Sequence, residues 1–368
     1  MFIKSLELEN YRNYKELNME FDKNTNILYG DNAQGKTNIL ESIYVCGTTK
    51  SHRTNKDKEL INFEKDESHI RLSVEKNDIS YRIDMHIKKN KPKGIALNGV
   101  PVKKASDLYG IVNCIFFSPE DLYIIKSGPS ERRRFTDVII SQLDKVYLED
   151  LISYNKIIDN RNKLLKDIQT NNSLRETLDV WDMQLCDYGK RIINKRKEFI
   201  KDLKSISKEI HHRITGGEEI LDIEYEPNVD VDNIEKDLFL SRDRDLINRS
   251  TSVGPHRDDM IIMINDVDIR KYGSQGQQRT AALSLKLSEI ELVKNKINTM
   301  PVLLLDDVLS ELDSKRQTLL LESISEIQTI ITCTGLDEFI KNRFNLDKIF
   351  RVESGRVSEE IKPDTGRI

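Results

Sequence analysis

Residues 30–38 combine the residue types that bind a chain of phosphates. Their sequence, Gly30-Asp31-Asn32-Ala33-Gln34-Gly35-Lys36-Thr37-Asn38, matches G-x-x-x-x-G-K-S/T at every fixed position. The glycines let the backbone turn its N–H groups toward one centre, Lys36 brings a positive charge to the terminal phosphates, and Thr37 offers a hydroxyl to Mg²⁺. We therefore expect this segment to bind ATP, with Thr37 as a ligand of Mg²⁺. A glycine-rich turn with an exposed lysine is the alternative.

Two carboxylates, Asp306 and Asp307, follow the apolar run from Val302 to Leu305. Such a run is typical of a strand buried on both faces, and open α/β sheets bind ligands at the carboxyl ends of such strands. We expect Asp306 to bind Mg²⁺, directly or through water, and Asp307 to orient and deprotonate an attacking water molecule. Asp307 and Lys36 are thus the predicted catalytic residues. The alternative is a solvated acidic turn after a core strand.

A second polar stretch, Ser274-Gln275-Gly276-Gln277, runs directly into a predicted helix. The N–H groups at a helix N-terminus, together with Ser274, Gly276 and Gln277, can bind a γ-phosphate. Two helix N-termini would crowd one phosphate within a single chain, so we expect this stretch to cover the nucleotide of a second subunit. The resulting ATP-dependent homodimer would have twofold symmetry and two shared sites. An ordinary helix cap with polar neighbours is the alternative.

The elements that position these residues are predicted to form an α/β fold with a helical insertion. Residues 1–125 read as the first part of an α/β head, with hairpin turns at Asn77-Asp78 and Asn98-Gly99. Residues 126–250 place apolar side chains at helical spacing without a long heptad seam, so we expect an all-helical lobe. The α/β pattern resumes over 251–368, where Asn265-Asp266 marks another hairpin. The predicted fold is a P-loop ATPase head of mixed sheet and helices, interrupted by this lobe.

The composition disfavours several classes of protein. No apolar run approaches the ~20 residues that span a bilayer, so we expect no membrane association. The four cysteines form no CxxC pair, which argues against a disulfide framework or a zinc site and favours a reducing cytoplasm. The formal net charge is -4 and the pI about 6.0, so any nucleic acid must be bound by local patches.

One basic stretch is a candidate surface for duplex DNA. Residues 190–213 contain nine Lys or Arg residues against three acids, and four of the lysines recur on one face of a predicted helix. Smaller basic clusters lie at 132–134 and 88–93. The residues predicted to bind DNA phosphates are Lys197, Lys201, Lys204, Lys208, Arg132 and Arg133. No recognition-helix motif points to base readout, and a solvated charged face is the alternative.

Two short motifs resemble those of ATP-binding-cassette (ABC) ATPases. SQGQQ (274–278) is similar to their signature motif with Gln275 in place of a glycine, and SELD (310–313) is similar to their D-loop. Longer stretches resemble the RecF family of bacterial DNA repair and recombination proteins, in the family's order and over nearly the whole chain. They are LELENYRNY (6–14), NAQGKTNILESIY (32–44), FFSPEDL (116–122), GPSERRRFTD (128–137), YNKIIDNRNKLLK (154–166), GPHRDD (254–259), YGSQGQQRTAALSLKLSE (272–289) and LLLDDVLSELD (303–313).

The resemblance implies an ABC-type ATPase head with a helical second lobe and no long coiled coil. It implies slow, DNA-dependent ATP hydrolysis, used as a switch by a dimer on double-stranded or gapped DNA. It also implies joint action with RecR, and with RecO and RecA downstream, in loading RecA. Arg12 and Asn13 lie near the position where related heads contact nucleotide, with a surface charge as the alternative. The segment 256–259 is either a catalytic cluster or a structural salt-bridge corner.

The chain departs from the ABC pattern near the predicted site. Thr332 and Thr334 lie in the strand after which many relatives have a histidine, so the sequence does not identify the residue that senses the γ-phosphate. Asp307 occupies the position where many relatives have a glutamate. Ser118 or Glu120 is the expected equivalent of a metal-facing glutamine. A transporter ATPase subunit and a small-molecule P-loop kinase are the rival functions. The basic stretch argues against the first, and the SQGQQ and SELD motifs argue against the second.

Overall fold

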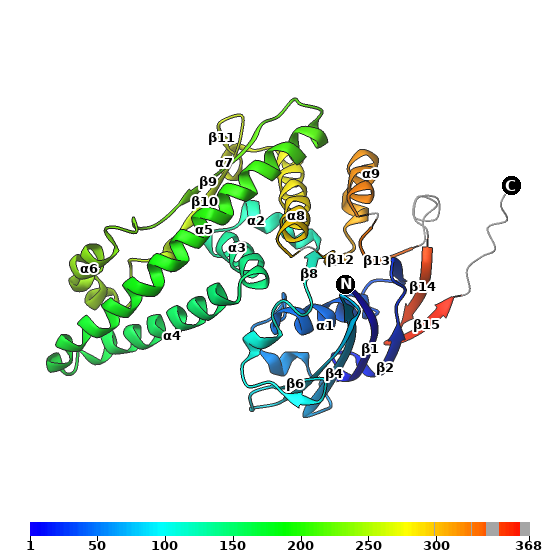
Figure 1. Cartoon of the computed structure of the whole chain (residues 1–368), viewed down its shortest axis with the longest axis horizontal. Coiled ribbons are helices and arrows are strands. Elements are labelled where there is room, and N and C mark those ends of the chain that lie inside the picture. The colour runs from blue at the N-terminus through cyan, green and yellow to red at the C-terminus, as the bar shows by residue number, and fades with distance from the viewer. Residues whose placement is uncertain (298, 325, 336–345, 361–368) are drawn as a thin grey trace. The chain divides into compact units, whose positions relative to one another are not determined.

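The protein divides into two compact units. The structure, a computed structural model, describes residues 1–297, 299–324, 326–335 and 346–360. The first unit comprises residues 1–121 and 293–368, and the second residues 122–292 (Figure 1). Residues 251–292, which the sequence predicts in the head, belong to the second unit because the strand at 259–264 pairs with the strand at 221–226. None of the described helices is long and apolar enough to cross a membrane.

The first unit contains a mostly parallel sheet with the strand order β15-β14-β3-β13-β12-β8. Its strands are β3 (Thr25–Tyr29), β8 (Cys114–Phe117), β12 (Val302–Asp306), β13 (Thr329–Cys333), β14 (Leu346–Glu353) and β15 (Arg356–Glu360). Among these strands, β15 alone runs antiparallel to its neighbour. The parallel strands therefore bring their carboxyl ends to one edge of the sheet. The run from Val302 to Leu305 is buried on β12, as its apolar sequence predicts.

A second sheet of the first unit is antiparallel, in the order β2-β1-β4-β5-β6-β7. Its strands are β1 (Phe2–Tyr11), β2 (Tyr14–Glu20), β4 (Glu67–Lys76), β5 (Ile79–Lys88), β6 (Gly94–Leu97) and β7 (Val100–Pro101). The hairpin turns predicted at Asn77-Asp78 and Asn98-Gly99 are confirmed, since β4 pairs with β5 and β6 with β7 across them. Burial alternates along β4 and over most of β5, so one face of the sheet joins the core and the other faces solvent.

Helix α1 (Lys36–Thr48) packs against both sheets of the first unit and is buried on nearly every side. Its residues Ile39, Leu40 and Ile43 share one hydrophobic core with side chains from the two sheets. Most of its buried side chains are apolar, as an enclosed helix requires, and the buried carboxylate of Glu41 is paired with Arg12. The core therefore fixes the start of α1 at the carboxyl edge of the parallel sheet. The other helical segments of this part of the chain are η1 (Asp57–Leu60), η2 (Ala105–Leu108), η3 (Pro119–Leu122), η6 (Leu309–Glu311) and α9 (Ser314–Ser323).

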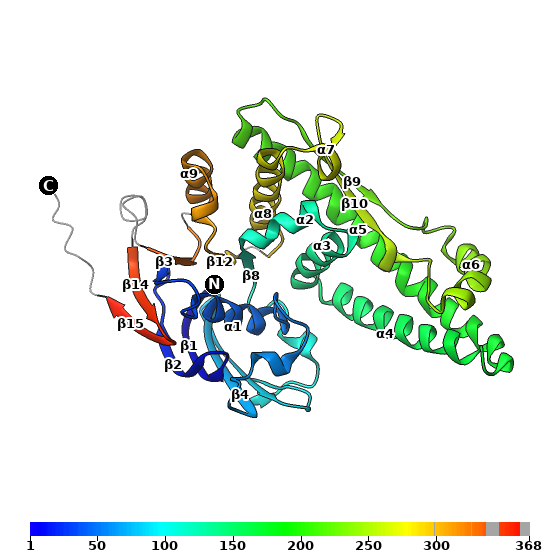
Figure 2. The same cartoon turned by 180° about the vertical axis from the view of Figure 1, so that it is seen from behind.

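The second unit combines helices with a three-stranded sheet, two strands of which are labelled in the rear view of Figure 2. Its helical segments are α2 (Tyr123–Lys126), α3 (Pro129–Leu143), α4 (Lys145–Asp167), η4 (Asn172–Thr177), α5 (Leu178–Thr215), α6 (Ile234–Asn248), η5 (Pro255–Arg257), α7 (Ile269–Tyr272) and α8 (Gln275–Ile297), the last extending past residue 292. Its strands are β9 (Leu221–Glu226), β10 (Asp259–Ile264) and β11 (Val267–Asp268). The expectation of an all-helical lobe is therefore wrong at β9, where Leu221 and Ile223 alternate with polar residues and pack inward. The hairpin predicted at Asn265-Asp266 is confirmed.

The segment 256–259 forms an ion-paired corner of the second unit. Asp258 is 1% exposed and accepts hydrogen bonds from Arg196, at 3.0 Å, and from the Tyr225 hydroxyl. Arg196 is itself buried and also donates to the carboxylate of Asp137 at 3.0 Å. Removing one partner of such a buried pair leaves an uncompensated charge. These contacts support the structural interpretation of the segment rather than the catalytic one.

His256 is expected to make the stability of the second unit depend on pH. The Thr251 carbonyl can only accept, so Nε2 donates to it at 3.0 Å, and Nδ1 accepts from the Tyr154 hydroxyl at 2.8 Å. Burial lowers the pKa of His256 from 6.5 to about 4, so the folded ring stays neutral where an unfolded histidine takes up a proton. Its contribution is complete above pH 6.5 and is lost as the pH falls from 6.5 toward 4, by at most about 1.4 kcal/mol per pH unit.

Urea unfolding between neutral pH and pH 4, followed by a probe in the second unit, measures this dependence. His256→Gln is the matched variant, because the amide keeps a donor and an acceptor and does not titrate. We expect the free energy of unfolding of the variant to fall less steeply with decreasing pH. Equal slopes for both proteins would show that His256 does not take part.

Candidate nucleotide-binding site

The loop between β3 and α1 is shaped by close contacts at its two glycines. Gly30 has a φ of +152°, and a Cβ atom there would overlap the carbonyl oxygen of Val352 on β14. Gly35 has a φ of +117°, and a Cβ atom there would collide with the side chains of Asn13 and Tyr14. Both positions therefore require glycine for space and for backbone conformation. The loop is a cradle whose walls are the last parallel strand and the β1–β2 turn.

The N-terminus of α1 opens into this cradle. Its N-cap is Gly35, so no side chain caps the helix, and its first turn carries no acidic residue. The free N–H groups and the helix dipole make this terminus suited to binding an anion. The Nζ of Lys36 donates to the carbonyl of Gly30 and, at 2.8 Å, to that of Asp31. Burial lowers the pKa of Lys36, and the carboxylates of Asp307 and Asp306 oppose the shift. The cradle thus has the backbone donors and the positive charge that a phosphate chain requires.

Asp306 lies directly beside the phosphate-binding loop at residues 30–38, the P-loop. The Thr37 hydroxyl donates to its Oδ1 at 2.9 Å, and the Thr332 hydroxyl donates to the same oxygen at 2.7 Å. The strand order explains the meeting, because β13 lies between β3 and β12 and carries Thr332. A hydroxyl and a carboxylate are the hard oxygen ligands that Mg²⁺ prefers. Thr37 and Asp306 therefore fit the magnesium site that the sequence predicts for them.

Asp307 follows β12 in a strained backbone conformation. Its φ is +53°, a value uncommon for a residue with a side chain and frequent at functional sites. Its N–H donates to the Thr332 hydroxyl at 3.0 Å and to the Thr332 carbonyl at 3.3 Å. One fully buried threonine therefore holds both members of the acidic pair. Thr332 is evident in the sequence as a residue of this strand. Its contact with the acidic pair is not, because the contact depends on the order of the strands in the sheet.

The P-loop and the acidic pair line one hollow of about 590 Å³. Its lining residues are Asn32 to Asn38, His52, Arg53, Ser118, Pro119, Glu120, Asp306, Asp307 and Thr332. Ser118 and Glu120, the expected equivalents of a metal-facing glutamine, are both part of this lining. His52 and Arg53 also line the hollow and are not among the residues predicted from the sequence. Their only signal is a position shortly after α1, in a loop whose course the sequence does not reveal.

His52 and Arg53 are held at the hollow by defined contacts. The His52 ring lies 3.9 Å from that of Phe116, at an interplanar angle of 30°. Arg53 donates to the side-chain oxygen of Asn38 at 2.9 Å and lies 4.0 Å from the carboxylate of Glu41. An imidazole and a guanidinium are thus presented beside the phosphate cradle, where both can bind the polar groups of a nucleotide.

Arg12 and Asn13 support the loop and do not line the hollow. Arg12 makes a two-pronged ion pair with Glu41, at 2.7 and 2.9 Å. Burial alone would raise the pKa of Glu41, but hydrogen bonds from Arg12 and Ser51 outweigh it and the pKa is lowered. Asn13 donates to the Gln34 carbonyl at 3.0 Å and accepts from the Asn38 side chain at 2.8 Å. Both residues therefore help to position the loop, and their contact with nucleotide stays a prediction.

In the second unit, Ser274 and Gln277 form a reciprocal cap on α8. The Ser274 hydroxyl accepts from the Gln277 N–H at 3.2 Å, and the Gln277 side-chain oxygen accepts from the Ser274 N–H at 3.0 Å. The alternative of a helix cap is thus present in the structure. Ser274, Gln275 and Gly276 are nevertheless exposed, and a Cβ at Gly276 would meet only the Ser274 hydroxyl, at 3.8 Å. Contact with the nucleotide of a second subunit stays a prediction.

The predicted DNA-binding residues differ in how they are placed. Lys197, Lys201 and Lys208 are exposed on α5, whereas Lys204 is paired with Asp222 at 2.7 Å.

The prediction is wrong for Arg132. This residue is 3% exposed and bound at 2.7 and 2.9 Å by the carboxylate of Asp259. Its neighbour Arg133 is half-buried and donates to the Asp258 carbonyl at 2.6 Å. A basic triplet in the sequence does not reveal which of its side chains face the protein interior.

Comparisons with known proteins agree over nearly the whole chain. The family model described as RecF/RecN/SMC N terminal domain matches residues 2–358. The DNA replication and repair protein RecF of Lachnospira eligens is 61% identical over 362 residues, covering 98% of this chain and 100% of that protein. The protein of the same name from Agathobacter rectalis is 62% identical over 357 residues, covering 97% of this chain and 99% of that protein.

A solved structure of the recombination mediator protein RecF with ATP, from the RecFOR pathway, superimposes with a TM-score of 0.92 at 37% identity and covers 98% of both chains. The Smc head bound to the C-winged helix domain of ScpA has a TM-score of 0.58 at 17% identity, which shows a common fold alone. The model match, the relatives and the superposition lead to one assignment: this chain belongs to the RecF family and has the ABC-type head fold of RecF and SMC proteins.

Proposed function

We propose that this protein is an ATPase that uses ATP to close as a homodimer on duplex DNA. The observation that carries the proposal is the meeting of Thr37, Asp306 and Asp307 around one hollow at the P-loop. The RecF–ATP structure, 37% identical to this chain, supports ATP as the ligand. The pathway named for that structure, RecFOR, supports joint action with RecR and RecO. Action with RecA downstream, on gapped DNA, is part of the same proposal.

In this mechanism, the residues of the first unit divide the work on the triphosphate. The P-loop N–H groups and Lys36 bind the phosphates. Thr37 and Asp306 would hold Mg²⁺, which would supply positive charge to stabilise the phosphate oxygens. Asp307 accepts the proton of the attacking water and orients it. Thr332 holds the acidic pair in place through the contacts described above. Slow hydrolysis suits a switch in which ATP binding closes the dimer and hydrolysis opens it.

The dimer interface is proposed to include the exposed cap of α8, from Ser274 to Gln277. Changing Ser274 to arginine is expected to leave ATP binding by the monomer intact and to reduce ATP-dependent dimerisation by about 100-fold, because a long charged side chain obstructs a close contact. Size-exclusion chromatography with light scattering, with and without ATP, measures the effect, and ATP binding is measured separately on the monomer.

Ser274→Ala is the matched control for the helix cap. Both variants lose the cap on α8, which costs about 1 kcal/mol, so equal stabilities are expected. The alanine variant should keep much of its dimerisation. If Ser274→Arg instead abolishes ATP binding by the monomer, the two-subunit site is wrong.

DNA is proposed to bind through exposed lysines of α5, among them Lys197, Lys201 and Lys208. Their contacts would be with phosphates, so affinity should fall steeply with salt. The test of the whole proposal is the size of the protein with and without ATP and duplex DNA over a series of salt concentrations. A monomer that ignores both ligands would refute it.

The two rival functions are not favoured. A transporter subunit or a small-molecule kinase would not be expected to match RecF relatives over 98% of its length. The four cysteines are buried and form no disulfide, in keeping with the proposed cytoplasmic location.

A further inference from the structure

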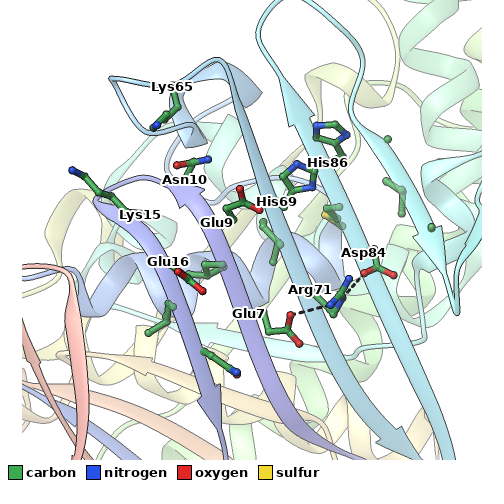
Figure 3. Close-up of a pocket in the computed structure, with 18 of the residues that line it drawn as sticks. Glu7, Glu9, Asn10, Lys15, Glu16, Lys65, His69, Arg71, Asp84 and His86 are labelled. Atoms are coloured by element: carbon green, nitrogen blue, oxygen red, sulfur yellow. Dashed lines mark hydrogen bonds and ion pairs between the residues drawn. The ribbon is translucent and has the colours of Figure 1, made fainter.

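The solvent face of the antiparallel sheet carries ordered rows of polar side chains around a hollow of about 790 Å³ (Figure 3). Strand register creates the rows, because directly opposed residues point to the same face. One row pairs Glu7 on β1 with Arg71 on β4 and Asp84 on β5. The next row pairs Glu9 with His69 and His86 on the same three strands.

The row through Arg71 is a satisfied ion-pair network. Arg71 lies 2.7 Å from the carboxylate of Asp84 and 3.0 Å from that of Glu7, as the dashed lines of Figure 3 show. Arg82 adds a further contact with Asp84 at 2.9 Å. Each carboxylate in this row already has a guanidinium partner, so the row offers little to an added cation.

The row through His69 and His86 is different, because it sets two imidazoles side by side. The two rings are stacked, with centroids 4.0 Å apart and an interplanar angle of 22°. Glu67 lies two residues before His69 on β4 and so points to the same face, and its Oε2 is 3.1 Å from His86 Nε2. One donor atom from each of these three side chains lies within 4.8 Å of the others.

We propose that Glu67, His69 and His86 form a binding site for a divalent transition-metal ion of the zinc class. Two imidazoles and one carboxylate are a donor set that suits Zn²⁺, which takes ligands at about 2.0–2.2 Å and leaves its fourth position to water. Donors on a tetrahedral ion lie about 3.3–3.5 Å apart, so side-chain rotation alone closes the observed spacing. The sheet fixes the backbone of both histidines, which reduces the cost of organising the site.

The cysteine pattern argues against a zinc site made of thiolates and does not bear on this one. The proposal is also independent of the nucleotide site, because all of its ligands come from β4 and β5. Neighbouring charged side chains are expected to change the affinity of the site for a cation. Lys88 lies 2.8 Å from Glu67 Oε2 and competes with a cation for that carboxylate, whereas Glu9, opposite His69, adds negative charge.

The test is calorimetric titration of the nucleotide-free full-length protein with Zn²⁺, after treatment with a chelator, in a buffer that does not bind zinc. We expect one zinc site per chain, and we expect each substitution of a ligand to weaken the binding of zinc. Glu67→Gln should weaken binding, and His69→Gln or His86→Gln should weaken it by about 100-fold, because even outer-shell partners of metal ligands contribute about 10–100-fold. Lys88→Gln should tighten binding, by about three- to tenfold, because it frees Glu67 and removes a positive charge. His212→Gln, at an exposed histidine of α5, is the matched control and should change nothing.

Cu²⁺ provides a second measurement that needs no variant. The electron paramagnetic resonance spectrum of the protein with one equivalent of Cu²⁺ should show hyperfine splitting from two nitrogens, and from one nitrogen in His86→Gln. ATP binding by each variant verifies that it is folded. Zinc binding that is absent from the unmodified chain, or unchanged in the double variant His69→Gln/His86→Gln, would overturn the site, as would a copper spectrum without nitrogen splitting. Weaker zinc binding in Lys88→Gln would also contradict it.

Discussion

A Lys36→Met chain should bind ATP about 100-fold more weakly than the unmodified chain and should not dimerise with ATP. The ammonium of Lys36 lies over the loop between Gly30 and Asp31, where it would make charge-assisted hydrogen bonds to phosphate oxygens. Each such bond contributes about 1.5–3 kcal/mol, and about 1.4 kcal/mol corresponds to a tenfold change in affinity. Methionine has nearly the same length and removes only the charge and the donors, so the fold should be kept. Calorimetric titration with ATP and Mg²⁺ measures the affinity.

The control for Lys36→Met is Lys91→Met, which removes an exposed lysine of the same unit. It should bind ATP with unchanged affinity. Thermal unfolding of Lys36→Met without nucleotide should match or exceed that of the unmodified protein, because a buried charge has been removed. A Lys36→Met protein that retains tight ATP binding and dimerises would refute the P-loop assignment.

An Asp307→Asn chain should bind ATP normally and hydrolyse it about 100- to 10,000-fold more slowly, the range expected for loss of a general base. Asparagine tolerates the left-handed φ of +53° found at this position, so the backbone anchored to Thr332 should not move. If hydrolysis opens the dimer, the variant should accumulate as a closed dimer on duplex DNA. Single-turnover hydrolysis measures the rate, and light scattering measures the dimer.

Asp306→Asn is the informative comparison for Asp307→Asn. Asp306 accepts from Thr37 at 2.9 Å and is a proposed ligand of Mg²⁺, so its loss should weaken Mg²⁺-dependent ATP binding as well as hydrolysis. The two neighbouring carboxylates should therefore be separable, one by affinity and the other by rate. An Asp307→Asn protein with normal turnover would exclude Asp307 from the chemistry.

Much of the nucleotide site is predictable from the sequence because its chemistry is local. The P-loop is contiguous, and Asp306 and Asp307 follow a run whose apolar character already indicates a buried strand. The contacts that hold these pieces together are not local. Thr332 reaches the acidic pair only because β13 is placed between β3 and β12, and the Arg12–Glu41 pair joins the β1–β2 turn to α1. Neither contact produces a pattern of residue spacing that could be recognised in the sequence.

Charge patterns were the least reliable guide to position. The triplet at 132–134 looks like a DNA-binding patch, yet Arg132 is buried against Asp259, since a paired guanidinium can be enclosed by the protein. The lobe was expected to be all-helical because helical spacing dominates residues 126–250. The strand β9 is only 6 residues long, and its partner β10 lies beyond the predicted boundary, so pairing across that boundary decided its structure.

The close approach of Gly30 to the Val352 carbonyl has a consequence for synthesis on the ribosome. The strand that leads into the P-loop, β3, is synthesised about 300 residues before its sheet neighbours β13 and β14. At about 5–20 residues per second, this interval lasts on the order of tens of seconds. The whole unit at 122–292 is synthesised during that time, whereas the nucleotide cradle is incomplete until β14 has been made. We therefore expect a nascent chain not to bind ATP in this cradle before β14 has been synthesised.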